Sequence, residues 1–194
     1  AMSYEEVLAA IKAGAVLVDG RSPEEFAQGH LRHAVNIGLE GRYAEFAGSV
    51  LPSDVDVVLF TEPGQELEGK NRLARIGFDR VIGYLDRPFD VMLEHRDDVQ
   101  VASRLTAKAF DQRASELPDL QVVDVRTDDE WRRGHICGAT HMMGGDVPER
   151  APELARAGAP LALVCQTGYR STVAASVLAR AGLPDVRSVT GGMN

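Results

Sequence analysis

The sequence predicts an α/β protein of two similar domains, each with a mainly parallel sheet that helices cover on both faces. The first observation is an internal repeat with an offset of 105 residues, because residues 18–21 (Val-Asp-Gly-Arg) align with residues 123–126 (Val-Asp-Val-Arg). Without any gap, the same register aligns residues 73–75 (Leu-Ala-Arg) with 178–180 (Leu-Ala-Arg), which indicates a duplicated domain. The second observation is that short apolar runs alternate with helical segments in each copy, which is typical of a parallel sheet.

The same elements are expected in each copy, in the same order. In the first copy they are a helix at 4–13, a strand at 15–19, a short helix opened by Ser22, strands at 35–37 and 55–60, a helix that ends before Gly77, and a strand at 80–84. In the second copy they are a helix at 107–117, a strand at 121–124, a short helix opened by Thr127, strands at 140–142 and 161–164, a helix at 172–180 that ends before Gly182, and a strand at 186–189. Ser and Thr are good N-caps, and the acidic residues behind them favour a helix start. The two glycines are expected to end the longer helices.

Each copy has about the size of a small independent domain, and the sequence places the two domains at residues 2–97 and 104–194. The stretch from Asp86 to about Ser103 is charged and only weakly periodic. It is therefore expected to be the connection between the domains.

Composition limits the classes of function. Of the 194 residues, 44% are hydrophobic and 26% are charged, which is ordinary for a soluble globular protein. No apolar run approaches the roughly 20 residues that cross a bilayer, so no membrane partner is expected. The net charge of −8 argues against nucleic acid as the main partner. The chain has two cysteines, Cys137 and Cys165, which fits a reducing cytoplasm, and its acidic start is unlike a signal peptide.

The most informative segment is a loop in the second copy. The apolar run 161–164 ends on Cys165, a short stretch with Gly168 and Arg170 follows, and a helix is expected from Thr172. Helix N-termini leave backbone N–H groups unpaired and carry partial positive charge, so a thiolate placed there is stabilised and reactive near neutral pH. The alternative is a buried, inert cysteine at a strand end, which leaves the glycine and the arginine unexplained. The pattern therefore predicts an anion-binding loop with a nucleophile at its base.

The first copy is an internal control for this loop. In register, Phe60 takes the place of Cys165, and Gln65 takes the place of Arg170. The first copy also carries two glutamates where the second copy would receive an anion. We therefore expect the first domain to be catalytically inactive, and to pack against the second, shape its entrance or bind a partner.

Further motifs accompany the loop. They are Val123-Asp124-Val125-Arg126, Glu130-Trp131, Gly134-His135-Ile136-Cys137-Gly138-Ala139, Cys165-Gln166-Thr167-Gly168-Tyr169-Arg170-Ser171 and Gly191-Gly192. The first copy repeats the Asp-x-Arg, Glu-Phe and Gly-His signals. In these motifs the chain resembles the rhodanese family of sulfurtransferases in tandem form. The resemblance covers nearly the whole chain and implies two rhodanese-like domains, an inactive copy followed by an active one.

That arrangement is similar to the rhodanese pairs fused behind metallo-β-lactamase-like persulfide dioxygenases. The resemblance thus implies a fused or associated partner of that kind, whose histidine- and aspartate-rich metal motif this chain lacks. The family usually continues into a final helix after Gly-Gly-Met-Asn194, so the C-terminus is expected to be truncated or disordered. Cys137 stands where the family usually has proline, and it is either a small apolar filler or a resolving thiol for Cys165.

The resemblance also implies a mechanism. Cys165 takes sulfane sulfur from thiosulfate or from a persulfide such as glutathione persulfide, holds it as a cysteine persulfide, and passes it to a thiol or cyanide acceptor. No cofactor and no metal are implied. Arg170 is expected to bind oxyanions with its guanidinium fork, Gly168 to permit positive φ or a close approach, and Ser171 to be an N-cap or a loop-bracing hydroxyl. The expected substrate-binding loop comprises Gln166, Thr167, Gly168, Tyr169 and Ser171.

Three more polar residues, Asp124, Arg126 and His135, have counterparts in the copy that lacks the cysteine. That persistence favours a scaffolding role over catalysis. The group of His135, Cys137 and His141 falls short of a closed zinc site, because no fourth ligand is evident.

Two other functions stay open. Phosphatase or arsenate-reductase chemistry needs five residues between the cysteine and the arginine, whereas four separate Cys165 from Arg170, so the smaller loop fits sulfur better. A binding or regulatory module without turnover suits the first copy, while the intact loop argues against it in the second. The donor, the acceptor and the oligomeric state are not determined by the sequence.

Overall fold

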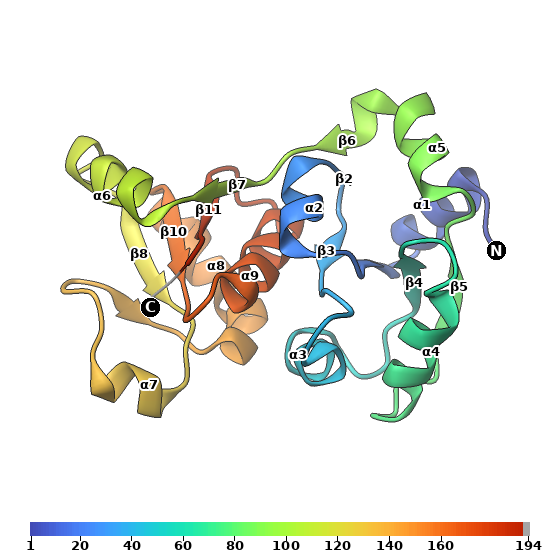
Figure 1. Cartoon of the computed structure of the whole chain (residues 1–194), viewed down its shortest axis with the longest axis horizontal. Coiled ribbons are helices and arrows are strands. Elements are labelled where there is room, and N and C mark those ends of the chain that lie inside the picture. The colour runs from blue at the N-terminus through green and yellow to red at the C-terminus, as the bar shows by residue number, and fades with distance from the viewer. Residues whose placement is uncertain (192–194) are drawn as a thin grey trace. The chain divides into compact units, whose positions relative to one another are not determined.

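The computed structural model describes residues 1–191 and divides into two compact units, Ala1–Val101 and Ala102–Asn194 (Figure 1). Each unit is an α/β domain on a parallel sheet, as the sequence predicts. The expectation of a truncated or disordered C-terminus after Gly191 lies outside the described residues. None of the helices within residues 1–191 is long and apolar enough to cross a membrane.

The first domain has a four-stranded parallel sheet in the order β3-β1-β4-β5. Its strands are β1 (Val16–Asp19), β2 (His30–Leu31), β3 (Val35–Asn36), β4 (Val57–Phe60), β5 (Val81–Tyr84) and β6 (Val99–Gln100). Its helices are α1 (Tyr4–Lys12), α2 (Pro23–Gln28), α3 (Tyr43–Val50), α4 (Glu66–Ala74) and α5 (Pro88–Glu94), with a 3-10 turn at Arg96–Asp98. The short strands β2 and β6 form a separate antiparallel pair.

The second domain has a five-stranded parallel sheet in the order β7-β11-β10-β8-β9. Its strands are β7 (Ser103–Leu105), β8 (Gln121–Asp124), β9 (Thr140–His141), β10 (Leu161–Val164) and β11 (Val186–Val189). Its helices are α6 (Ala107–Glu116), α7 (Asp128–Arg133), α8 (Val147–Ala157) and α9 (Tyr169–Arg180), with a 3-10 turn at Gly144–Asp146. The central strand β10 therefore leads directly into the loop that precedes α9.

The predicted helix ends match in the two copies. Ser22 and Thr127 each cap their helix with a capping box, in which the hydroxyl accepts a backbone N–H and the glutamate three residues later bonds back to the cap. Gly77 and Gly182 follow α4 and α9, and each donates its N–H to the carbonyl three residues earlier, at 3.1 and 3.0 Å. Local sequence signals therefore determine where these helices begin and end.

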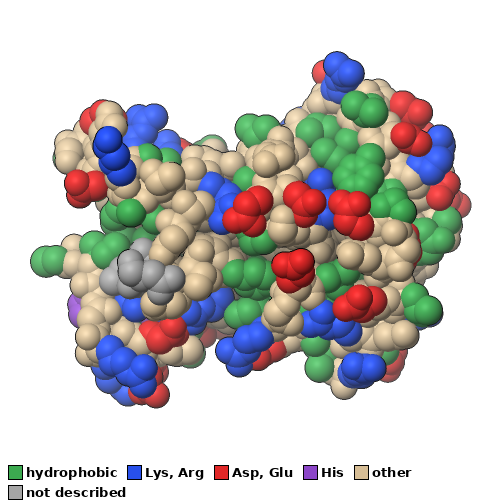
Figure 2. Space-filling model, viewed as in Figure 1, with side chains coloured by type: hydrophobic (Ala, Val, Ile, Leu, Met, Phe, Trp, Pro, Cys, Tyr) green, Lys and Arg blue, Asp and Glu red, His purple; other side chains and the backbone are tan. Residues whose placement is uncertain are grey.

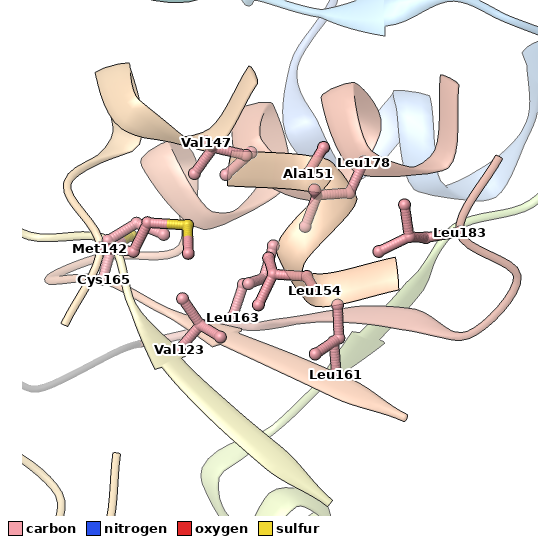
Figure 3. Close-up of a cluster of buried hydrophobic side chains, with 12 residues drawn as sticks. Val123, Met142, Val147, Ala151, Leu154, Leu161, Leu163, Cys165, Leu178 and Leu183 are labelled. Carbon is pink, nitrogen blue, oxygen red and sulfur yellow. The ribbon is translucent and has the colours of Figure 1, made fainter. Parts of the chain in front are cut away.

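The core of the second domain lies on both faces of its sheet. Leu161 and Leu163 of β10 belong to one buried cluster with residues of α8 and α9. Cys165, two residues further on, belongs to the same cluster (Figure 3). Ala162 and Val164 belong to a separate cluster on the other face, against which Phe110 of α6 packs. Burial on both faces explains why the strand is apolar at every position.

The structure corrects two expectations. The helices α3 and α8 are not among the elements expected from the sequence. The connection between the domains is also shorter than the predicted stretch from Asp86 to Ser103, because α5, a 3-10 turn and β6 occupy most of it. Pro88 and Val91 of α5 are buried, so this charged segment forms part of the first domain.

Candidate active site

Cys165 follows the last residue of β10 and is completely buried, with 0% of its surface exposed. Its position combines the carboxyl end of a central parallel strand with the N-terminus of α9, a helix that runs from Tyr169 to Arg180. Such strand ends are where α/β sheets usually bind ligands. The helix adds unpaired N–H groups and partial positive charge at the same point.

Two backbone N–H groups point at the cysteine sulfur. Gly168 N lies 3.1 Å from Sγ and Ser171 N lies 3.4 Å from it. The thiol also contacts Ser171 Oγ at 3.5 Å. N–H groups fixed in this way can donate to the sulfur, including the terminal sulfur of a persulfide.

Gly168 is the residue that lets the loop turn. Its φ is +100°, and a Cβ there would lie 3.3 Å from Thr190 Cα and 3.3 Å from Val189 O. Both the backbone conformation and the crowded surroundings therefore require glycine. The predicted helix start at Thr172 is too late, because Gly168 is the N-cap and α9 begins at Tyr169.

Of the two roles expected for Ser171, the structure shows the bracing one. Ser171 lies within the first turn of α9, so it is not the N-cap. Its hydroxyl donates to Gly168 O at 3.1 Å, and the Thr172 hydroxyl donates to the same carbonyl at 2.8 Å. These bonds fix the carbonyl of Gly168, the residue whose own N–H approaches the sulfur.

Arg170 forms a bidentate ion pair with Glu130 of α7. The distances are 2.6 Å from Nη1 to Oε2 and 2.7 Å from Nη2 to Oε1. These hydrogen bonds, with smaller contributions from bonds of Thr127, lower the pKa of Glu130 from its ordinary 4.5 to about 2. Glu130 also raises the pKa of Arg170, with smaller contributions from Cys165. The guanidinium fork that was expected to bind oxyanions is thus occupied by a carboxylate, and its charge lies near the sulfur.

The Asp-x-Arg motifs form the same buried ion pair in both domains. Arg126 Nη2 lies 2.7 Å from Asp124 and 2.7 Å from Gly134 O. Arg21 Nη2 lies 2.6 Å from Asp19 and 2.9 Å from Gly29 O. An arrangement that is present with and without the cysteine supports the scaffolding role expected for Asp124 and Arg126.

The two Gly-His motifs are also alike. His135 Nδ1 lies 3.0 Å from Trp131 O and its ring stacks on Trp131 at 3.5 Å. His30 Nδ1 lies 2.9 Å from Phe26 O, with the rings 3.8 Å apart. His30 is buried and His135 is exposed, so the matching bonds persist in two different environments.

Cys137 is exposed and unbridged, so it is not the packed apolar filler that was one of its two expected roles. His141 Nε2 contacts Arg126 O at 2.8 Å, and His141 Nδ1 lies 3.5 Å from Asp128. In the described part of the chain, no group of three or more His, Cys, Asp or Glu side chains could hold a metal ion.

The corresponding loop of the first domain has a phenylalanine in place of the cysteine and a carboxylate bonded to its backbone. Phe60 is completely buried, and the guanidinium of Arg21 lies over its ring at 4.4 Å from the centroid. Gly64 N donates to the carboxylate of Glu66, with both oxygens at 3.0 Å. One N–H group of this loop is therefore already bonded to a carboxylate of the same domain.

A pocket of about 650 Å³ adjoins the loop of the second domain. We call it the α7 pocket, and it is lined by Arg126, Glu130, Arg133, Gly134, His135 and Gln166. Basic and acidic side chains lie together on the surface over α7, which has three acidic residues in its first turn and two arginines in its last (Figure 2). Of the residues expected to bind substrate, Gln166 lines the pocket, while Thr167 is exposed and Tyr169 is half-buried.

Sequence reasoning missed two residues at this site. Glu130 served only as a family signal, and its pairing with Arg170 spans 40 positions, which no local pattern reveals. Arg133 is not among the residues expected at the site, although the repeat offers a signal for it, because the first copy has Gln28 at the corresponding position.

Comparison with known proteins gives matches to one family. Residues 3–91 and 106–194 both match the family described as "Rhodanese-like domain". "Putative sulfur carrier protein YrkF" of Bacillus subtilis is 33% identical over 89 residues, which cover 46% of this chain and 48% of YrkF. "Thiosulfate sulfurtransferase GlpE" of Shewanella oneidensis is 32% identical over 80 residues, which cover 41% of this chain and 78% of GlpE.

Among solved structures, a thiosulfate sulfurtransferase from Pseudomonas aeruginosa aligns with 99% of this chain and 41% of its own, at 21% identity and a TM-score of 0.44. The alignments thus span about half the length of YrkF and less than half of the Pseudomonas aeruginosa protein.

Proposed function

Since the chain belongs to the rhodanese family through both of its domains, we propose that its second domain transfers sulfane sulfur through a persulfide on Cys165. The observation that carries the proposal is the environment of Sγ, which lies 3.1 Å from Gly168 N and 3.4 Å from Ser171 N at the start of α9. The same donors suit the attacking thiolate and the negatively charged persulfide that replaces it.

The reaction has two steps, and its atoms and charges balance. In the first, the Cys165 thiolate attacks the outer sulfur of thiosulfate, the S–S bond of the donor breaks, and sulfite leaves with the bonding electrons. In the second, the acceptor attacks the outer sulfur of the Cys165 persulfide, and the cysteine leaves as a thiolate. A thiol R–SH gives R–S–SH in this step, and cyanide gives thiocyanate. A persulfide donor R–S–S⁻ enters the first step in the same way and releases R–S⁻.

Arg170 has an electrostatic and a positioning role in this proposal. Its charge lies near the sulfur, and its bidentate bond to Glu130 fixes the first turn of α9 against α7. The anionic donor is met first by loop N–H groups, with Gln166, Thr167 and Tyr169 on the loop beside them.

The first domain is proposed to be inactive. Phe60 replaces the nucleophile, and the carboxylate of Glu66 already accepts the N–H of Gly64. A second anion there would meet like charge. The resemblance to pairs fused with persulfide dioxygenases makes such an enzyme, as a fused or separate source of sulfur donor, the proposed partner.

Steady-state sulfur transfer tests the proposal, with thiosulfate and glutathione persulfide as donors and cyanide and a thiol as acceptors. Cys165→Ser should abolish transfer from both donors, while Cys137→Ser, the matched control at the other cysteine, should retain it. Undiminished transfer by Cys165→Ser would refute the assignment. Phosphatase turnover that exceeds sulfur transfer would favour phosphoryl chemistry instead, which the four-residue spacing between Cys165 and Arg170 disfavours.

A further inference from the structure

The α7 pocket holds charges that are mostly neutralised within the domain. Arg126 is paired with Asp124, and Glu130 is paired with Arg170. Among residues 1–191, the guanidinium of Arg133 has neither a hydrogen bond nor an ion pair, and it is exposed. The pocket therefore presents one uncompensated positive charge next to the loop that carries the cysteine.

The neighbouring arginine is different. Arg132 lies 3.3 Å from the carboxylate of Asp129, and it does not line the pocket. The two arginines share the last turn of α7 and differ in what they face. This difference makes Arg132 a natural control for the loss of one positive charge.

The first domain lacks this feature. Its residue in register with Arg133 is Gln28, at the end of α2. The residue in register with His135 is His30, which is buried and belongs to β2, paired with β6. The exposed Arg133 and the exposed His135 thus both occur in the domain that has the cysteine.

We propose that the α7 pocket binds the part of the thiol substrate remote from sulfur, and that Arg133 selects thiols that carry a carboxylate. This inference rests on the proposed sulfur transfer and names the substrate class for it. Guanidinium binds carboxylate in a planar fork, and His135 also lines the pocket. A volume of about 650 Å³ accommodates an amino-acid or small-peptide thiol.

The chemistry is the second step of the transfer. The sulfur of the acceptor R–SH attacks the outer sulfur of the Cys165 persulfide, R–S–SH forms, and the Cys165 thiolate is released. Arg133 takes no part in bond making. It raises the concentration of carboxylate-bearing thiols beside the loop and orients them, so its effect belongs to specificity.

The test compares N-acetylcysteine with N-acetylcysteine amide as acceptors, with thiosulfate as the donor. The two thiols differ in one carboxylate, and the comparison of each variant with wild type cancels their intrinsic reactivity. Arg133→Gln, which copies the first domain, should lower kcat/KM for N-acetylcysteine about threefold to tenfold, with the amide changed less than about twofold. Arg132→Gln should change neither, and added salt should reduce the preference of wild type.

Two results would overturn the inference. One is a ratio of kcat/KM for the two acceptors that stays unchanged in Arg133→Gln. The other is an equal change of that ratio in Arg132→Gln, which would mean a general effect of charge. Transfer to cyanide, which has no carboxylate, separates this failure from failure of the proposed function. Normal cyanide turnover with an unchanged acceptor ratio refutes only the role of Arg133, whereas absence of turnover with every acceptor refutes sulfur transfer itself.

Discussion

Replacement of Arg170 by glutamine, the residue in register in the first domain, should weaken both the second domain and its chemistry. The change removes two short hydrogen bonds to Glu130, at 2.6 and 2.7 Å. It also leaves the carboxylate of Glu130 without its cation. The negative charge then opposes a thiolate or persulfide on Cys165, so we expect sulfur transfer to fall about 10-fold to 100-fold.

The size of the effect on stability follows from the pair itself. The pKa of Glu130 is about 2 against an ordinary 4.5, and a shift of that size corresponds to about 3 kcal/mol. Bonds from Thr127 supply part of it, and the two side chains keep 21% and 24% of their surface exposed. Solvent screening therefore leaves about 1–2 kcal/mol for Arg170.

Urea titration followed by tryptophan fluorescence measures this quantity in the second domain, because Trp131 is the single tryptophan of the chain. A double-mutant cycle with Arg170→Gln and Glu130→Gln should give a coupling energy of about 1–2 kcal/mol at pH 7. The pKa of Glu130 is lowered by folding, so this stabilisation is present above pH 4.5 and is lost as the pH falls towards 2. Additive effects of the two substitutions, or a coupling that does not decline in acid, would refute the reasoning.

Three further predictions compare positions in the two domains. Gly168→Ala should abolish sulfur transfer and cost about 1–3 kcal/mol of stability. Gly64→Ala should leave transfer intact, although φ is +93° there too, because an added Cβ would have no atom within 4 Å. Transfer assays and urea titration check both variants. Asp124→Asn and Asp19→Asn should each destabilise their own domain by about 3–5 kcal/mol, because each leaves a buried arginine unpaired. Hydrogen exchange resolved by domain should show an equal loss of unfolding free energy in the two variants. In a chain that also carries Cys165→Ser, Phe60→Cys should create no sulfur transfer, because the carboxylate of Glu66 already accepts a loop N–H of the first domain. Turnover above that of Cys165→Ser alone would contradict this.

Much of the fold was predictable because it depends on local signals. Ser22 and Thr127 begin their helices with capping boxes that are legible in the sequence. The helix α3 has no side-chain cap to mark its start. The helix α8 begins with a proline in its first turn, but it also contains Pro152, and an internal proline argues against a helix in a sequence. The many charged residues around α5 made it resemble a linker in the sequence, whereas in the structure burial of Pro88 and Val91 attaches this helix to the first domain.

The candidate site was predictable where its residues are adjacent and missed where they are distant. Cys165, Gly168 and Arg170 lie within one loop, and positive φ at Gly168 agrees with the role expected of it. The partner of Arg170 belongs to another helix, so the spacing within the loop could not reveal that its guanidinium fork is occupied. Glu130, which pairs with Arg170, also lines the pocket that Arg133 lines, so both features depend on contacts between distant parts of the sequence.

The most direct test of the account is the mass of the Cys165 peptide after incubation with thiosulfate and no acceptor. Sulfur transfer through this residue predicts a mass increase of one sulfur atom on Cys165, in wild type and in Cys137→Ser, that disappears when cyanide or a thiol is added. No increment on Cys165 while turnover continues, or an increment on Cys137 alone, would contradict the account.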